Sequence, residues 1–145
     1  MSTTEEVNTV NFRRTYEELL SQGNVAIADE LVTADFLNHA APPGMNRGPE
    51  SMRLLVRMLR TAFPDLHYTV EDVVVEGDTV AGRVTMSGTH LGPYMGIPPT
   101  GRSFQMAEMH FVHFRDGKGL EHWGTRDDLG MMRQLGIIPA PGEAR

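Results

Sequence analysis

The stretch RSFQMAEMHFVHFRDGKGLEHWGT, residues 102–125, decides the fold. Side chains over 102–114 follow the two-residue period of a long β-strand. The sequence Arg115-Asp116-Gly117-Lys118 predicts a tight turn, and a second strand is expected over 119–125. The long strand is apolar on both faces, with Phe104, Met106 and Val112 on one and Ala107, Met109 and Phe111 on the other. Such a strand indicates a sheet that is covered on both sides.

Two more strands are expected just before this stretch. Residues 67–76 and 79–90 have the same period, and Glu76-Gly77-Asp78 between them is typical of a hairpin turn. Residues 91–101 contain three glycines and three prolines, which predicts a long loop. After the last strand, Asp127 or Asp128 can cap a short helix that ends before Gly136.

The N-terminal part of the chain reads as helix. Apolar residues with helical spacing predict a first helix that ends at Gly23, and Asn24 can cap a second helix reaching Val32. Residues 35–50 are rich in Pro and Gly and are expected to form a loop or an irregular strand. A third helix is predicted from about Pro49 to Pro64.

Helices followed by antiparallel strands are typical of an α+β domain. We expect one domain over the 145 residues, with flexible segments at 1–8 and 138–145. The helices can cover one face of the sheet. A second copy of the chain is the simplest cover for the other face, so a homodimer is expected, and the pattern does not distinguish it from a tetramer.

Composition excludes several classes of function. The net charge is −6, which argues against nucleic acid or an anionic membrane as the main partner. No run of about 18 apolar residues predicts a membrane span. The chain has no cysteine, which excludes disulfides, thiolate metal sites and cysteine nucleophiles and agrees with a cytoplasmic location. No metal-binding spacing, phosphate loop or dinucleotide motif occurs, so we expect no metal and no cofactor.

Histidines and carboxylates are the reactive residues that remain. Glu108 and His110 lie two residues apart on one face of the long strand, while His113 points to the other face. If the face of Glu108 looks inward, burial costs free energy unless both groups have partners or a function; if it looks outward, no explanation is needed. Asn38 and His39 form a second polar spot in the region after the second helix.

The order of several short motifs resembles the SnoaL-like polyketide cyclase family. These motifs are Asn38-His39, Phe63-Pro64-Asp65, Gly88-Thr89-His90, Pro99-Thr100-Gly101-Arg102, Asp116-Gly117-Lys118, Glu121-His122-Trp123, Asp127 and Gln134-Leu135-Gly136. The match spans roughly residues 10 to 137. The resemblance implies a cone-shaped α+β barrel, with a curved, mostly antiparallel sheet and helices around a central pocket. It also implies cofactor-independent closure of a polyketide ring by intramolecular aldol condensation.

Carried over by motif, the resemblance implies that Asp127 is the general acid/base, assisted by His110 and Asn38. Asp128 is an alternative to Asp127, and His113 is an alternative to His110. The substrate is expected to contact His39, Trp123, Glu108, Met106, Met86, Phe63 and Met58. A second carboxylate at Glu108 departs from the neutral neighbour expected beside the histidine and would alter the proton affinity of the pocket.

Two other functions remain open from the sequence. One is an enzyme of the same fold with different chemistry, such as a hydroxylase, hydrolase or dehydratase. The other is a non-catalytic protein that binds a small apolar ligand. Inward-facing Asp127 and His110 would favour an enzyme, whereas outward-facing ones would favour a binding protein.

Overall fold

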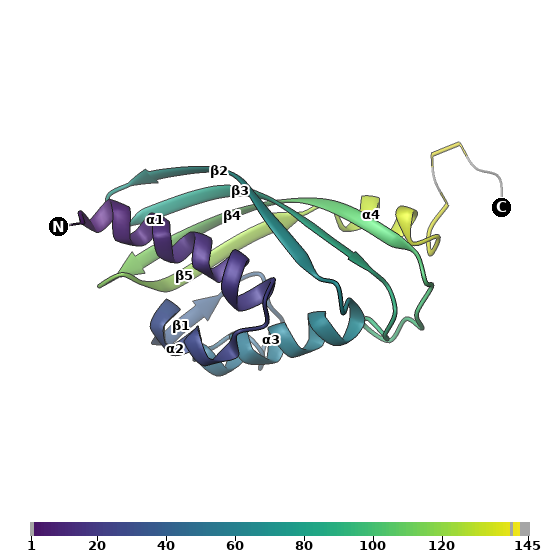
Figure 1. Ribbon diagram of the computed structural model, residues 1–145, viewed down its shortest axis with the longest axis horizontal. Helices are drawn as coiled ribbons and strands as arrows, with labels where there is room; N and C mark the ends of the chain where they lie inside the picture. The colour runs from purple at the N-terminus through teal and green to yellow at the C-terminus, as the bar shows by residue number, and fades with distance from the viewer. Residues whose placement is uncertain (1, 140, 143–145) are drawn as a thin grey trace.

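The computed structural model describes residues 2–139 and 141–142, and its centre is a curved five-stranded sheet (Figure 1). The strands are β1 (Val32–Asn38), β2 (His67–Glu76), β3 (Thr79–Thr89), β4 (Ser103–Arg115) and β5 (Lys118–Arg126). Their order across the sheet is β1-β5-β4-β3-β2. Only β1 and β5 pair in parallel among these strands; the other three pairs are antiparallel. The α+β class is confirmed, and the expected barrel is an open, curved sheet with β1 and β2 at its edges.

Short helical segments and one long helix lie on one side of the sheet, which arches over α3 in Figure 1. They are α1 (Thr4–Arg14), the π-helical turn η1 (Thr15–Leu20), the 3-10 turn η2 (Val25–Ile27), α2 (Ala28–Leu31) and α3 (Gly48–Ala62), and α4 (Asp128–Gln134) follows β5. Within residues 2–139 and 141–142, no helix is long and apolar enough to cross a membrane.

The start of α1 overlaps the N-terminal segment that was expected to be flexible. Residues 4–8 belong to α1, where the Thr3 side chain accepts from the Glu6 N–H and the Glu6 carboxylate accepts from the Thr3 N–H. This capping box satisfies two backbone donors that a helix start otherwise leaves unpaired. Of the segments expected to be flexible, residues 1, 140 and 143–145 lie outside the described residues.

Strand β1 replaces the end of the expected second helix and the start of the expected loop. The chain leaves α2 at Leu31, and Val32 begins a strand that pairs with β5. The burial of β1 does not alternate, and its register shifts between Val32 and Leu37. An irregular edge strand of this kind has no two-residue period, which is why sequence periodicity could not separate it from a loop.

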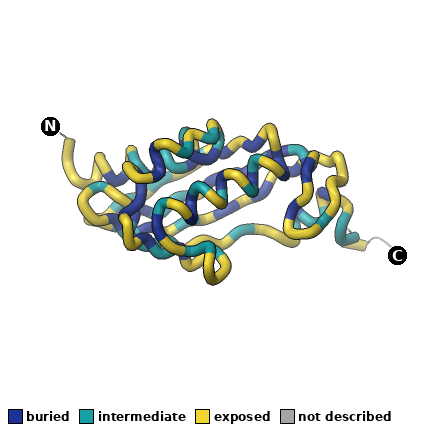
Figure 2. The backbone as a smooth tube through the Cα atoms, turned by 90° about the horizontal axis from the view of Figure 1, so that it is seen from below, coloured by how far each residue is buried: buried dark blue, intermediate teal, exposed yellow. Residues whose placement is uncertain are grey.

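The core lies between the concave face of the sheet and the helices. On β4 the even-numbered residues from Phe104 to Phe114 are buried or nearly so, and Gln105, Ala107, Met109 and Phe111 are exposed. Glu108 therefore faces inward, as one of the two interpretations predicted. In Figure 2 buried residues lie mainly where helices and sheet face each other.

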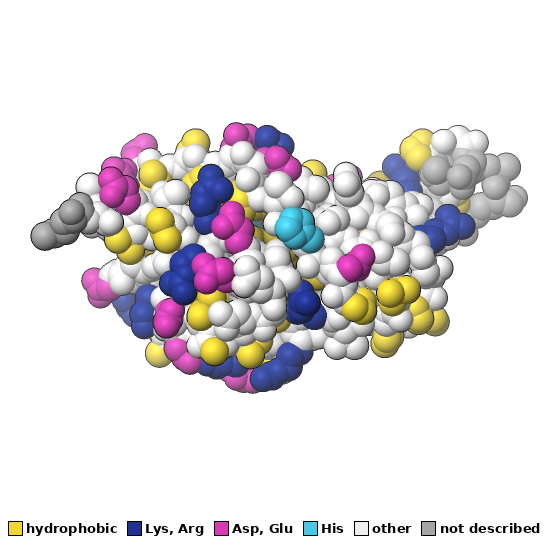
Figure 3. All heavy atoms as spheres, in the orientation of Figure 1, with side chains coloured by type: hydrophobic (Ala, Val, Ile, Leu, Met, Phe, Trp, Pro, Cys, Tyr) yellow, Lys and Arg dark blue, Asp and Glu magenta, His cyan; other side chains and the backbone are white. Residues whose placement is uncertain are grey.

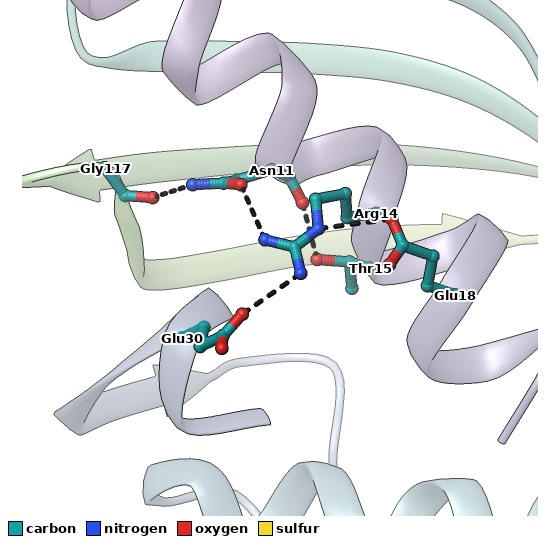
Figure 4. Close-up of polar contacts among 6 residues, drawn as sticks. All are labelled: Asn11, Arg14, Thr15, Glu18, Glu30 and Gly117. Atoms are coloured by element: carbon teal, nitrogen blue, oxygen red, sulfur yellow. Dashed lines mark hydrogen bonds and ion pairs between the residues drawn. The ribbon is translucent and has the colours of Figure 1, made fainter. Parts of the chain in front are cut away.

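Polar contacts fix α1 relative to the sheet and to α2 (Figure 4). The Asn11 side-chain amide donates to the Gly117 carbonyl at 2.7 Å, across the β4–β5 turn. Arg14 donates to Glu18 at 3.1 Å and to Glu30 of α2 at 3.0 Å. Figure 3 shows charges of both signs interspersed over the end of the molecule where α1 lies. These contacts hold α1 and η1 against one side of the cavity described below.

Candidate active site

A cavity of about 470 Å³ lies between the concave face of the sheet and the segments from α1 to α3. This volume is in the range of small-molecule sites. Its wall is mainly apolar, with residues such as Phe12, Leu20, Phe36, Met52, Met58 and Leu59. Tyr16, Tyr68 and Tyr94 add phenolic side chains, and burial is the main cause that raises the pKa of each. These phenols are therefore neutral at physiological pH.

Four polar side chains form a continuous hydrogen-bonded chain on the cavity wall. Glu108 Oε1 lies 2.7 Å from His110 Nε2, and His110 Nδ1 lies 2.7 Å from His122 Nε2. His122 Nδ1 lies 2.6 Å from Asn38 Oδ1. The residues come from β4, β5 and the end of β1, three strands that are adjacent in the sheet. The link from His122 to Asn38 therefore depends on the pairing of β1 with β5, and the link from His110 to His122 on that of β4 with β5.

The hydrogen bonds of Asn38 determine which nitrogens carry protons along this chain. Asn38 Oδ1 also accepts from the Ala40 backbone N–H at 2.9 Å, so His122 Nδ1 must carry the hydrogen that it shares with Asn38. Burial, followed by the charge of His110, lowers the pKa of His122 to about 3. His122 is therefore neutral near pH 7, and its Nε2 accepts a hydrogen bond from His110 Nδ1–H.

One proton remains between Glu108 and His110. With Nδ1 of His110 protonated, the 2.7 Å contact between Nε2 and Glu108 Oε1 holds a single proton. The pair is either a carboxylate beside an imidazolium or a carboxylic acid beside a neutral imidazole. Glu108 is 2 % exposed, and its second oxygen, Oε2, has no hydrogen-bond partner among the described residues. The site therefore offers a buried oxygen that can accept or release a proton.

Gly124 makes room for the two imidazoles. It pairs with His110 across β4 and β5. A Cβ atom at this position would lie 2.8 Å from His110 Nδ1 and 3.1 Å from His122 Cε1. A side chain at position 124 would occupy the space of the His110–His122 hydrogen bond.

The structure brings some of the expected site residues together and separates others. Asn38, Glu108, His110 and Met58 line the cavity. Asp127 does not: its exposed carboxylate accepts from the Gly130 N–H at 2.9 Å and caps α4. Its neighbour Asp128 lies on the cavity wall. The carboxylate buried beside His110 is that of Glu108, which corrects the placement expected for Asp127.

Two residues expected to contact the substrate, His39 and Trp123, lie outside the cavity lining. Their rings stack with centroids 4.8 Å apart, and His39 bonds Glu121 at 2.8 Å, away from the cavity lining. Trp123 lies on the outer face of the sheet, where its ring also contacts that of His113. His113 is therefore not the inward histidine.

Three further residues expected to contact the substrate belong to the core and do not line the cavity: Phe63, Met86 and Met106. Phe63, for example, packs edge-on against Phe104. Their apolar character alone could not distinguish a cavity wall from the core behind it.

Sequence reasoning missed His122 and Arg126. Alternation along β5 places His122 opposite Trp123 and on the same face as Gly124 and Arg126. The large apolar Trp123 suggested that its own face was the inner one. The available signal for the true inner face was Gly124, a small residue two positions after His122 and on the same face of the strand. Among the described residues, no group of three His, Asp or Glu side chains has an arrangement that could hold a metal ion.

Comparison with known proteins identifies relatives over most of the chain. The family model for the SnoaL-like polyketide cyclases matches residues 10–135. The nogalonic acid methyl ester cyclase of Streptomyces nogalater is 33% identical over 117 residues, which are 79% of this chain and 87% of that protein. The aklanonic acid methyl ester cyclase AcmA of Streptomyces galilaeus is 34% identical over 115 residues, 72% of this chain and 79% of that protein.

Solved structures show the same fold. TsrD from Streptomyces laurentii superposes with a TM-score of 0.83 at 31% identity, covering 90% of this chain and 96% of TsrD. IdmH from Streptomyces antibioticus superposes with a TM-score of 0.77 at 34% identity, covering 89% of this chain and 98% of IdmH.

Proposed function

Since the chain belongs to the SnoaL-like polyketide cyclase family, we propose that it closes a ring of a polyketide by an intramolecular aldol reaction in the cavity. Two relatives are named as cyclases of polyketide methyl esters. The mainly apolar wall can hold a folded polyketide with its reacting carbons close together. Much of the entropic cost of bringing these carbons together is then met when the substrate binds, which lowers the barrier of the ring closure. The reaction needs one group that removes a proton from carbon and later returns a proton to oxygen.

Glu108 is the group that we propose for this role, and its buried carboxylate beside His110 is the observation that carries the proposal. In the ion-pair state, Glu108 removes a proton from a carbon between two carbonyls. The enolate carbon then bonds to the second carbonyl carbon, and that oxygen becomes an alkoxide. Proton return from Glu108 gives the alcohol and restores the carboxylate. The positive charge of His110 stabilises the enolate during these steps.

His122 and Asn38 act through His110 in this proposal. The hydrogen bond that His122 donates to Asn38 fixes the tautomer of His122, and His122 fixes that of His110. They are positioning residues, in the manner of the group that orients a catalytic histidine elsewhere.

The test compares two carboxylate substitutions. Glu108→Gln retains the shape of the side chain but cannot accept a proton, so turnover should fall by about 10²–10⁴. Asp127→Asn is the matched control, because Asn also caps helices well, and turnover should stay within about twofold of the wild type. The assay follows ring closure of nogalonic or aklanonic acid, each as the methyl ester and as the free acid. An active Glu108→Gln protein with an inactive Asp127→Asn protein would overturn the proposal and restore the expectation from sequence.

We also propose that the protein is a homodimer joined through the outer face of the sheet. Val74, Met109, Phe111 and Trp123 are exposed apolar residues, and all four line a shallow groove on that face. Contiguous apolar surface of this kind is typical of interaction sites. The cytoplasmic location and the independence from metals and cofactors stay predictions.

A further inference from the structure

We propose that Arg126 selects a substrate that carries a free carboxylate, bound close to the carbon from which Glu108 removes a proton. The inference rests on the proposed function, and it concerns the substrate class. Arg126 lies at the end of β5 and lines the cavity. It is the only lysine or arginine among the described residues of the cavity wall.

The register of the sheet places Arg126 beside the proposed base. Arg126 on β5 pairs directly with Glu108 on β4, so the two side chains project from neighbouring points of the same concave face. The two charged groups do not form an ion pair, although their Cβ atoms are expected about 5 Å apart. A ligand can therefore meet both groups: its carboxylate at Arg126 and its acidic carbon at Glu108.

The guanidinium has two side-chain partners, Asp128 and the Tyr94 hydroxyl, and neither binds it in a two-pronged ion pair. Its ion pair in the structure joins Nε to Asp128 Oδ1 at 3.4 Å, a loose contact with an exposed carboxylate. Such a contact contributes little, and the two terminal nitrogens can bind a planar carboxylate through two parallel hydrogen bonds. A methyl ester carries no charge and gains less from this arrangement.

Charge makes this local cation necessary for an anionic substrate. The whole chain has a net charge of −6, and Asp128 adds negative charge at the cavity wall, where His110 balances the charge of Glu108 in the ion-pair state. Burial disfavours the charged form of Arg126, but the pKa of Arg126 is raised, with the carboxylates of Glu108 and Asp128 among the causes. The guanidinium therefore stays positive over the whole working pH range.

The experiment measures binding without turnover, so that its outcome is independent of the cyclase chemistry. Anthraquinone-2-carboxylate and its methyl ester are titrated into wild-type protein and into Arg126→Gln and Arg126→Lys by calorimetry. Arg126→Gln should weaken binding of the acid about tenfold and change binding of the ester by less than twofold. The lower end of the range for charged hydrogen bonds applies because the side chain is 32% exposed. Arg126→Lys keeps the charge and should retain most of the preference for the acid.

An equal loss for acid and ester, or no loss for the acid, would overturn the inference. Salt supplies a second measurement on the wild-type protein, which applies even if Arg126→Gln does not fold. If Arg126 binds the acid, raising the salt concentration should weaken binding of the acid and leave the ester unchanged. If only the overall negative charge acts, salt should strengthen binding of the acid, and the inference fails. Failure of the Glu108→Gln test would leave these binding results unaffected.

Discussion

The substitution Gly124→Ala tests whether the spacing of the imidazoles matters, because it removes no polar group from the site. The added Cβ would lie 2.8 Å from His110 Nδ1, whereas ordinary contacts begin at 3.4 Å, so the ring must move by about 0.6 Å (3.4 − 2.8). His110 cannot move freely, because it bonds Glu108 at 2.7 Å and packs against the Tyr16 ring, with centroids 4.9 Å apart. The His110–His122 hydrogen bond, now 2.7 Å, would lengthen beyond its best range.

The expected cost follows from these distances. Overpacking of a core typically costs about 1–3 kcal/mol, and replacing glycine by alanine returns about 0.4–1 kcal/mol through the unfolded chain. The free energy of unfolding should therefore fall by about 1–2 kcal/mol. A displacement of about 1 Å at a catalytic group can cost 10²-fold in rate, so a shift of about half that size should lower kcat at least tenfold.

Gly119→Ala is the matched control on the same strand. Its added Cβ meets only ordinary contacts, the nearest being 3.5 Å from the Leu31 carbonyl oxygen and from Val112. We expect this variant to be as stable as the wild type or slightly more stable, with unchanged kcat. Urea unfolding and turnover are measured for both variants. If Gly124→Ala matched Gly119→Ala in stability and in kcat, the geometry of the imidazole pair would be irrelevant to both.

Two further predictions follow from the site and the outer face. The pKa of His122 is about 3 in the folded protein against 6.5 in the unfolded chain, so only the unfolded chain gains this proton as the pH falls through 6.5. The contribution of His122 to stability is complete above pH 6.5 and falls by up to about 1.4 kcal/mol per pH unit below it. Urea unfolding between pH 5 and 7 should show that the free energy of unfolding depends less steeply on pH in His122→Gln than in the wild type. Equal dependence in the two proteins would contradict the shifted pKa. Phe111→Glu, on the exposed apolar face, should convert the dimer to a monomer of 16.1 kDa in sedimentation equilibrium with the fold retained, whereas a wild-type monomer at micromolar concentration would refute the dimer itself.

Local patterns in the sequence were sufficient for most of the elements. The two-residue period of β4, the turns at Gly77 and Gly117 and the helical stripe of α3 are properties of neighbouring residues, and all of them predicted the structure. The inward face of β4 was one of two predicted alternatives, because both faces are apolar and periodicity does not distinguish a core from an interface. Asn38 and His110 were identified through the order of the family motifs, and the structure places both at the cavity.

The tertiary structure alone decided which groups meet. Asn38 and His122 are 84 residues apart and contact each other only because β1 pairs in parallel with β5, a pairing without a local signal. His110 and His122 meet across the β4–β5 hairpin. Asp127 follows β5 directly, yet the start of α4 turns its carboxylate to the Gly130 N–H, so Glu108 is the buried carboxylate. The sequence by itself determined the elements and the types of reactive residue, because these depend on interactions between near neighbours. Strand pairing and helix geometry determined which carboxylate is buried beside His110, because burial is a sum over contacts from the whole chain.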